Sequence, residues 1–133
     1  MTEIKNSFAK WQRLSRDNPE GLVDDFLARR RNISPESQRA LFASVPDRDV
    51  LVQNINAACA SPDTPLCGIP YILQDLFDVD GLPTGCGAPF QDPFQAPLED
   101  ASLLYQKLKG LGGFLLAKTV PSEFGVDPRQ PFG

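Results

Sequence analysis

Two short apolar runs, separated by a stretch of helical periodicity, constrain this chain more than any other feature. Residues 68–73 (GIPYIL) and residues 114–117 (FLLA) are short, apolar and bounded by glycine or polar residues, which is typical of buried strands. Between them, apolar side chains recur at helical spacing over residues 98–111: Ala101, Leu104, Tyr105, Leu108 and Leu111. Gly112-Gly113 then predicts the end of that helix. Strand, helix, strand is the parallel crossover unit, which is right-handed.

The predicted fold class is therefore α/β, with one parallel β-α-β unit. A parallel sheet is normally buried on both faces, and a two-stranded sheet is rarely stable alone. The sequence thus implies more sheet than this chain supplies. Glycines and prolines at close intervals predict a long irregular loop over residues 78–97.

Residues 1–60 have a different composition, with 3 prolines and 1 glycine against 10 prolines and 9 glycines in residues 61–133. This difference favours helices in the first part, and four are predicted. The first has Ile4, Phe8 and Trp11 on one face, and the second runs from Asn18-Pro19 to Arg29–Arg31. The third begins at Ser34-Pro35, with Ala40, Leu41 and Val45 as its apolar side, and the fourth begins at Pro46-Asp47 and fades before Ser61-Pro62. Their apolar stripes are narrow, which indicates packing onto another layer. We divide the chain into a helical leader, residues 1–62, and an α/β segment, residues 63–133, within one structural unit.

Composition excludes several classes of function. The net charge of -4 argues against bulk binding of nucleic acid. The absence of histidine removes every His-based triad and every His metal ligand. Three cysteines are too few and too widely spaced for a C-x-x-C zinc pair, and their odd number favours a reducing cytoplasm over a disulfide framework. No apolar run is long enough for a membrane span, and the N-terminus MTEIKNSFAKW lacks a signal-peptide core.

Four short motifs follow one another in the second half. They are GIPYILQD at residues 68–75, GLPTGCGA at residues 81–88, Asp100-Ala101 opening a helix, and Ala117-Lys118-Thr119 followed by Glu123-Phe124. Over about residues 64–125, their order, spacing and residue types resemble the N-terminal third of the amidase signature family. Residues 1–60 resemble the variable helical leader of that family loosely.

The resemblance implies a fold and a chemistry. Members of the family hydrolyse or transfer amide groups with a Ser–cis-Ser–Lys arrangement, in which an amine activates a serine nucleophile. The resemblance implies that Gln74 occupies the position of the family lysine. Glutamine cannot accept the proton of the serine nucleophile, and loss of a general base typically lowers the rate by a factor of about 10²–10⁴. Gly87-Ala88 stands where the family has Gly-Ser, so a hydroxyl is lost. Residues 127–132 resemble the stretch shortly before the Gly/Ser-rich loop that carries both serines. We expect a chain truncated before that loop, with no catalytic residue.

Other candidate sites have simpler interpretations. Gln74 is either a ligand-binding amide or a polar residue left at a strand end after selection for catalysis relaxed, and we favour the second. We expect Cys67 and Cys86 to be inert thiols, because no histidine is present to lower their pKa. Ser7-Phe8-Ala9-Lys10 matches the S-x-x-K of penicillin-binding enzymes without its partner motifs.

Charged and glycine-rich segments also favour structural roles. Asp75, Asp78 and Asp80 lack the order of an EF-hand, which favours a turn with exposed carboxylates. Residues 81–87 lack the G-K-[ST] of a phosphate loop. Arg29–Arg31 are interpreted as a solvated helix end. We therefore expect no metal and no cofactor.

Three functional hypotheses follow from these features. The first is a truncated, catalytically inactive amidase-like protein, not an enzyme on its own. The second is a binding or regulatory subunit that docks onto another amidase-type chain. The third is an active enzyme whose nucleophile half is encoded separately, and Gln74 counts against it. For partners, we expect self-association or an amidase-type chain, and neither nucleic acid nor membrane.

Overall fold

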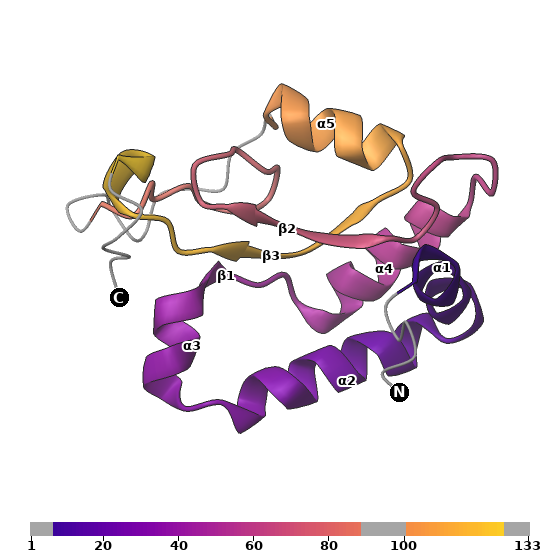
Figure 1. Cartoon of the computed structure of the whole chain (residues 1–133), viewed down its shortest axis with the longest axis horizontal. Helices are drawn as coiled ribbons and strands as arrows, with labels where there is room; N and C mark the ends of the chain where they lie inside the picture. The colour runs from indigo at the N-terminus through magenta and orange to yellow at the C-terminus, as the bar shows by residue number, and fades with distance from the viewer. Residues whose placement is uncertain (1–6, 89–100, 127–133) are drawn as a thin grey trace.

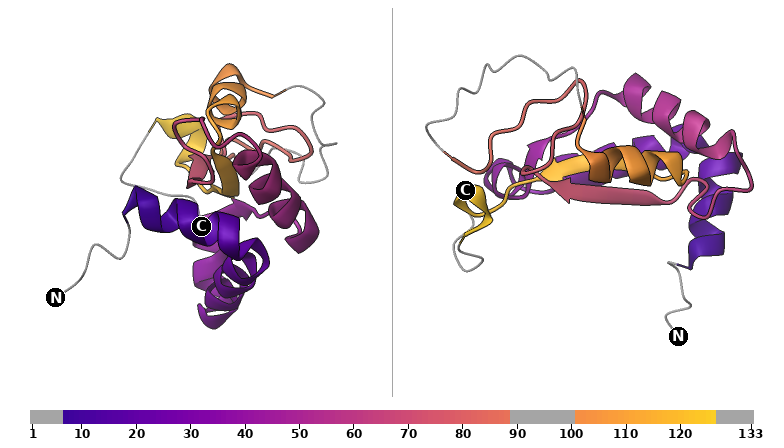
Figure 2. Two further views of the ribbon diagram at one scale, coloured as in Figure 1. Left: turned by 90° about the vertical axis from the view of Figure 1, so that its right-hand side faces the viewer. Right: turned by 90° about the horizontal axis from the view of Figure 1, so that it is seen from above.

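The structure, a computed structural model, describes residues 7–88 and 101–126. A small sheet is covered by helices on two sides, with α5 on one and α1, α2 and α4 on the other (Figures 1 and 2). In chain order the elements are α1 (Phe8–Asp17), α2 (Pro19–Asn32), α3 (Pro35–Leu41), β1 (Phe42–Ser44), α4 (Arg48–Cys59), β2 (Pro70–Gln74), α5 (Leu103–Gly110), β3 (Phe114–Thr119) and the 3-10 turn η1 (Glu123–Gly125). The fold is α/β, as predicted.

The predicted β-α-β unit corresponds to β2, α5 and β3. β2 and β3 are parallel, in a register that runs from Pro70 opposite Phe114 to Gln74 opposite Thr119. The sheet has a third strand that was not predicted, because β1 pairs antiparallel with the end of β3 in the order β1-β3-β2. Three residues are too few to show strand periodicity, and the hydrogen-bond partner of β1 lies far along the chain. Val45 follows this strand and is not on α3, contrary to the prediction.

The starts of the helices follow their capping residues. The Asn18 side chain accepts the Gly21 N–H before Pro19 opens α2, and the Ser34 side chain accepts the Ser37 N–H before Pro35 opens α3. Both starts confirm the predictions. Several predicted positions lie outside the described residues: Ile4 of the first helix, residues 98–100 (with Asp100) of the last helix, residues 89–97 of the predicted loop, and residues 127–132. Residues 78–88 of that loop are described and contain no helix or strand.

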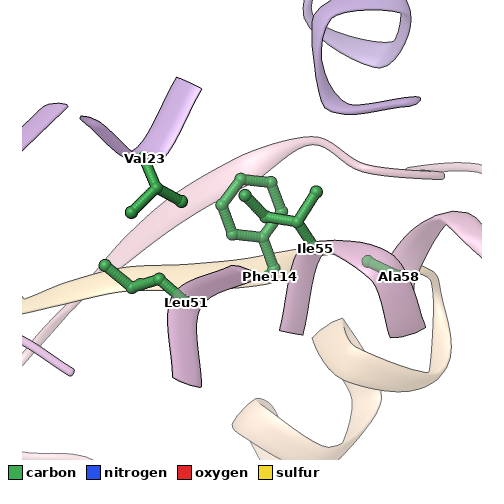
Figure 3. Close-up of a cluster of buried hydrophobic side chains, with 5 residues drawn as sticks. All are labelled: Val23, Leu51, Ile55, Ala58 and Phe114. Atoms are coloured by element: carbon green, nitrogen blue, oxygen red, sulfur yellow. The ribbon is translucent and has the colours of Figure 1, made fainter. Parts of the chain in front are cut away.

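The first hydrophobic core joins the helical leader to the sheet. Val23 of α2 and Leu51, Ile55 and Ala58 of α4 pack with Phe114 of β3 (Figure 3). Each large aliphatic side chain buried in this way contributes about 1.5–3 kcal/mol. Helices α2 and α4 of the leader therefore pack against the sheet, as their narrow stripes predicted, whereas α3 buries none of its residues.

A second core lies under α5. It consists of Leu73 of β2, Val79, Tyr105 of α5 and Leu115 of β3. Successive side chains of a strand point to opposite faces, so Phe114 and Leu115 serve the two different cores. The small sheet is thus buried on both faces along β3. No helix in the described parts of the chain combines the length and the apolar character that crossing a membrane requires.

Candidate functional site

A buried ion pair lies where the two parallel strands end, the edge of an α/β sheet at which ligands usually bind. The Lys118 side chain of β3 is 0% exposed, and its Nζ lies 2.5 Å from Asp75 Oδ1. The same ammonium donates hydrogen bonds to the Pro83 carbonyl at 2.8 Å and to Thr84 Oγ1 at 2.9 Å. An ammonium has three donors, so the three neighbours match its full capacity. Lys118 belongs to the Ala117-Lys118-Thr119 motif, but its burial in an ion pair was not predicted from the sequence.

Asp75 connects the end of β2 to the loop at residues 81–88. Its Oδ2 accepts the Gly85 N–H at 2.9 Å, and its backbone carbonyl accepts the Cys86 N–H at 3.0 Å. The prediction of exposed carboxylates is correct for Asp78 and Asp80 and wrong for Asp75, which is 7% exposed. The reason is the lysine on the neighbouring strand, since a carboxylate is buried only where a cation and donors compensate its lost hydration.

The segment after β3 holds the same loop from the other side. The Phe124 N–H donates to the Cys86 carbonyl at 2.8 Å. Gly87 has a φ of +67°, and a Cβ there would lie 2.7 Å from the Pro121 carbonyl oxygen. Only glycine fits this approach without a backbone shift. Loop 81–88, β2 and the end of β3 therefore form one interlocked unit.

Gln74 is the last residue of β2 and lies opposite Thr119 in the register. Its side chain is exposed and makes no hydrogen bond with any residue that the structure describes. Neighbouring side chains on a strand alternate between faces, so Gln74 and Asp75 point to opposite sides of the sheet. The amide of Gln74 is therefore accessible at this edge, while the carboxylate of Asp75 is enclosed.

The Cys86 thiol lies near this edge and is not activated. Burial raises the pKa of the Cys86 thiol, the Asp75 and Asp78 carboxylates raise it further, and the opposing influence of the Lys118 charge does not reverse the shift. A raised pKa keeps the thiol protonated and unreactive at neutral pH. Cys67 is buried, and Ser122 is 8% exposed. Cys59, Cys67 and Cys86 are all free thiols.

The remaining candidate motifs have structural roles. The Ser7 hydroxyl accepts the Lys10 N–H at 3.3 Å and caps α1, so the S-x-x-K pattern marks a helix start. Arg29 pairs with Asp25 at 2.7 Å on the exposed end of α2, in keeping with a solvated helix end. Within the described residues, no group of three cysteines or carboxylates is placed to hold a metal ion.

Comparison with known proteins agrees with this architecture. Residues 22–130 match the family model described as Amidase. A glutamyl-tRNA(Gln) amidotransferase subunit from Akkermansia muciniphila is 32% identical over 133 residues, which cover 95% of this chain and 26% of that protein. The corresponding protein from Alcanivorax borkumensis is 29% identical over 134 residues, which cover 95% of this chain and 26% of that protein.

Solved structures share the fold. An allophanate hydrolase of Kluyveromyces lactis superimposes with a TM-score of 0.68 at 20% identity, over 90% of this chain and 20% of that one. A crystal structure of an amidase gives a TM-score of 0.64 at 26% identity, over 90% and 28% of the two chains. The present chain spans about a quarter of the length of the curated relatives named above. Its parallel β-α-β unit, the helices packed on it and the match over residues 22–130 together place the chain in the amidase family.

Proposed function

We propose that these 133 residues form an amidase-family unit that does not hydrolyse amides by itself. The proposal rests on Gln74, the exposed last residue of β2, at the position where the family resemblance implies the lysine base. A carboxamide has no basic nitrogen at any ordinary pH, so it cannot take the proton of a serine. The geometry of the surrounding groups supports the same view.

Lys118 is another amine at the ends of the parallel strands, and its environment argues against a role as general base. A general base has to come within hydrogen-bond distance of the proton that it accepts. The Lys118 side chain is 0% exposed, and its amine already contacts Asp75, Pro83 and Thr84. A substrate would have to displace this enclosed arrangement to reach the amine. We therefore assign Lys118 a structural role.

The purified 133-residue chain is expected to show no amidase activity on aliphatic amides, aromatic amides or glutamine. Gln74→Lys is expected to leave the rate at background as well, because triad members act as a unit and the 133 residues contain no Gly/Ser-rich loop. Release of ammonia is the measurement, with an active full-length amidase as positive control. Turnover that persists through further purification would contradict the proposal, and Cys86→Ser and Ser122→Ala would then locate the nucleophile.

A second candidate function is docking onto another amidase-type chain. Among residues 7–88 and 101–126, no strand pairs with the outer edge of β2. Ile72 on this strand is 56% exposed, and Gln74 near it is exposed too. An unpaired edge with apolar surface favours the addition of another chain. Relatives that are named as subunits, and a structural neighbour described as part of a vestigial protein complex, are consistent with such a role.

The isolated chain is expected to self-associate at micromolar concentration or to unfold at low temperature. The cause is the open edge of β2, together with exposed apolar side chains such as Ile72 and Leu103, which is 66% exposed. Light scattering combined with thermal melting tests this. Ile72→Lys, which places a charge at the edge, is expected to reduce association, and Leu103→Lys on α5 is the comparison. A monodisperse monomer with a cooperative melt at high temperature would refute the expectation.

We also propose a cytoplasmic location, based on the three free thiols.

A further inference from the structure

A surface hollow lies between the end of α2, α3 and β1. It has a volume of about 360 Å³ and is lined by Arg30, Pro35, Gln38, Arg39 and Phe42. These residues come from three consecutive elements, and none of them is part of the candidate site described above. The lining combines two cationic side chains with an aromatic ring and a proline.

The two arginines of the hollow form no ion pair with any residue that the structure describes. Arg29 pairs with Asp25 at 2.7 Å, and Arg48 pairs with Asp24 at 2.7 Å. By contrast, neither Arg30 nor Arg39 forms an ion pair within the described ranges 7–88 and 101–126. Arg30 Nε is buried and has no hydrogen-bond partner there. The Arg30 guanidinium therefore has donor capacity that no described residue satisfies, which favours an anion that accepts its hydrogen bonds.

An aromatic pair orients Arg30. Its guanidinium carbon lies 5.8 Å from the centroid of the Phe42 ring, within the range of a cation–π contact. Phe26 packs edge-on against the same ring at 6.3 Å, and Phe42 is held in place because β1 pairs with Thr119 of β3. The guanidinium therefore rests on a ring that the core and the sheet both position. This preorganisation lowers the entropic cost of binding an anion.

We propose that this hollow binds the phosphate group of a small organic phosphate monoester. Two guanidinium groups that form no ion pair with a described residue match a dianion, and their planar donors match the oxygen atoms of phosphate. A single carboxylate would leave one of the two charges unbalanced. The hollow has the volume of about ten water molecules at about 30 Å³ each, so it has room for more than a phosphate group alone. The Phe42 and Pro35 side chains then offer apolar contact to the carbon body of the ligand.

Titration of the ¹⁵N-labelled chain at low, constant ionic strength tests the proposal with three probes. Inorganic phosphate carries the anionic group alone, phenyl phosphate adds a flat apolar body, and benzoate offers the same ring with a single negative charge. Saturable shifts are expected at the amides of residues 30, 39 and 42, with phenyl phosphate binding tightest. Absence of saturable shifts with phenyl phosphate, or equal affinity for benzoate, would overturn the proposal.

Matched variants separate this hollow from general electrostatic attraction. Arg30→Gln and Arg39→Gln are each expected to weaken phenyl phosphate binding by about tenfold, the scale of one charge-assisted interaction. Arg29→Gln removes a charge from the same helix end, where Arg29 is paired with Asp25, and is expected to leave binding within about twofold. Circular dichroism checks that each variant is folded. Equal losses in all three variants would show nonspecific attraction and contradict the proposal.

Discussion

Lys118→Met is expected to lower the free energy of unfolding by about 3–5 kcal/mol, the usual cost of removing one partner from a buried ion pair. Methionine fills a similar volume, so the loss reflects charge rather than packing. Without the ammonium, the Asp75 carboxylate at 7% exposure keeps only its bond from the Gly85 N–H among the described residues. The Pro83 carbonyl and the Thr84 hydroxyl also lose their donor. Loop 81–88 is then held less firmly to the strand ends.

Urea unfolding followed by circular dichroism measures this loss. Lys107→Met, at an exposed position of α5, is the matched control and is expected to change stability by less than about 0.5 kcal/mol. Adding Asp75→Asn to Lys118→Met is expected to restore part of the loss, because it removes the uncompensated charge. A loss below about 1 kcal/mol for Lys118→Met, or a double variant that is less stable than Lys118→Met alone, would contradict the assignment of a buried, coupled pair.

Gly112→Ala is expected to cost about 2–4 kcal/mol, the sum of a backbone penalty and a packing penalty. Gly112 follows α5 with a φ of +87°, a conformation that costs other residues about 1–2 kcal/mol. A Cβ there would also lie 2.8 Å from the Cys67 backbone nitrogen and would collide with the Thr64 side chain. Relieving that contact would disturb the hydrogen bond from the Gly68 N–H to the Gly112 carbonyl, 2.7 Å long, just before β2 begins. Overpacking of this kind adds about 1–3 kcal/mol.

Gly110→Ala provides the comparison within the same helix. Gly110 is the last residue of α5, has no positive φ, and a Cβ there would meet no atom within 4 Å. Alanine is therefore expected to raise stability by about 0.5 kcal/mol, through the smaller backbone entropy of the unfolded chain. Thermal melts of both variants, compared with the unmodified chain, measure the two changes in stability. Equal effects of the two substitutions would contradict the role given to the left-handed conformation of Gly112.

Local signals in the sequence determined most of the secondary structure. Asn18-Pro19 and Ser34-Pro35 mark helix starts because the capping side chain and the fixed φ of proline act within a few residues. Gly112 marks the end of α5 for an equally local reason, its left-handed backbone. The apolar runs and helical periodicity of residues 68–117 specified the β-α-β unit. The ordered motifs over residues 64–125 indicated the family, which the match over residues 22–130 confirms.

Contacts between distant segments decided the rest. β1 has three residues and is stabilised by pairing with the end of β3, so no local pattern announces it. The burial of Asp75 depends on Lys118, which the parallel register of β2 and β3 brings beside it. The sequence shows Asp75 merely as one of three nearby acidic residues. Arg30 of α2 and Arg39 of α3 likewise line one hollow, beside the Phe42 ring of β1, only in the folded chain. Propensity and capping act over a few residues, whereas charge compensation and strand pairing depend on neighbours that only the folded chain supplies.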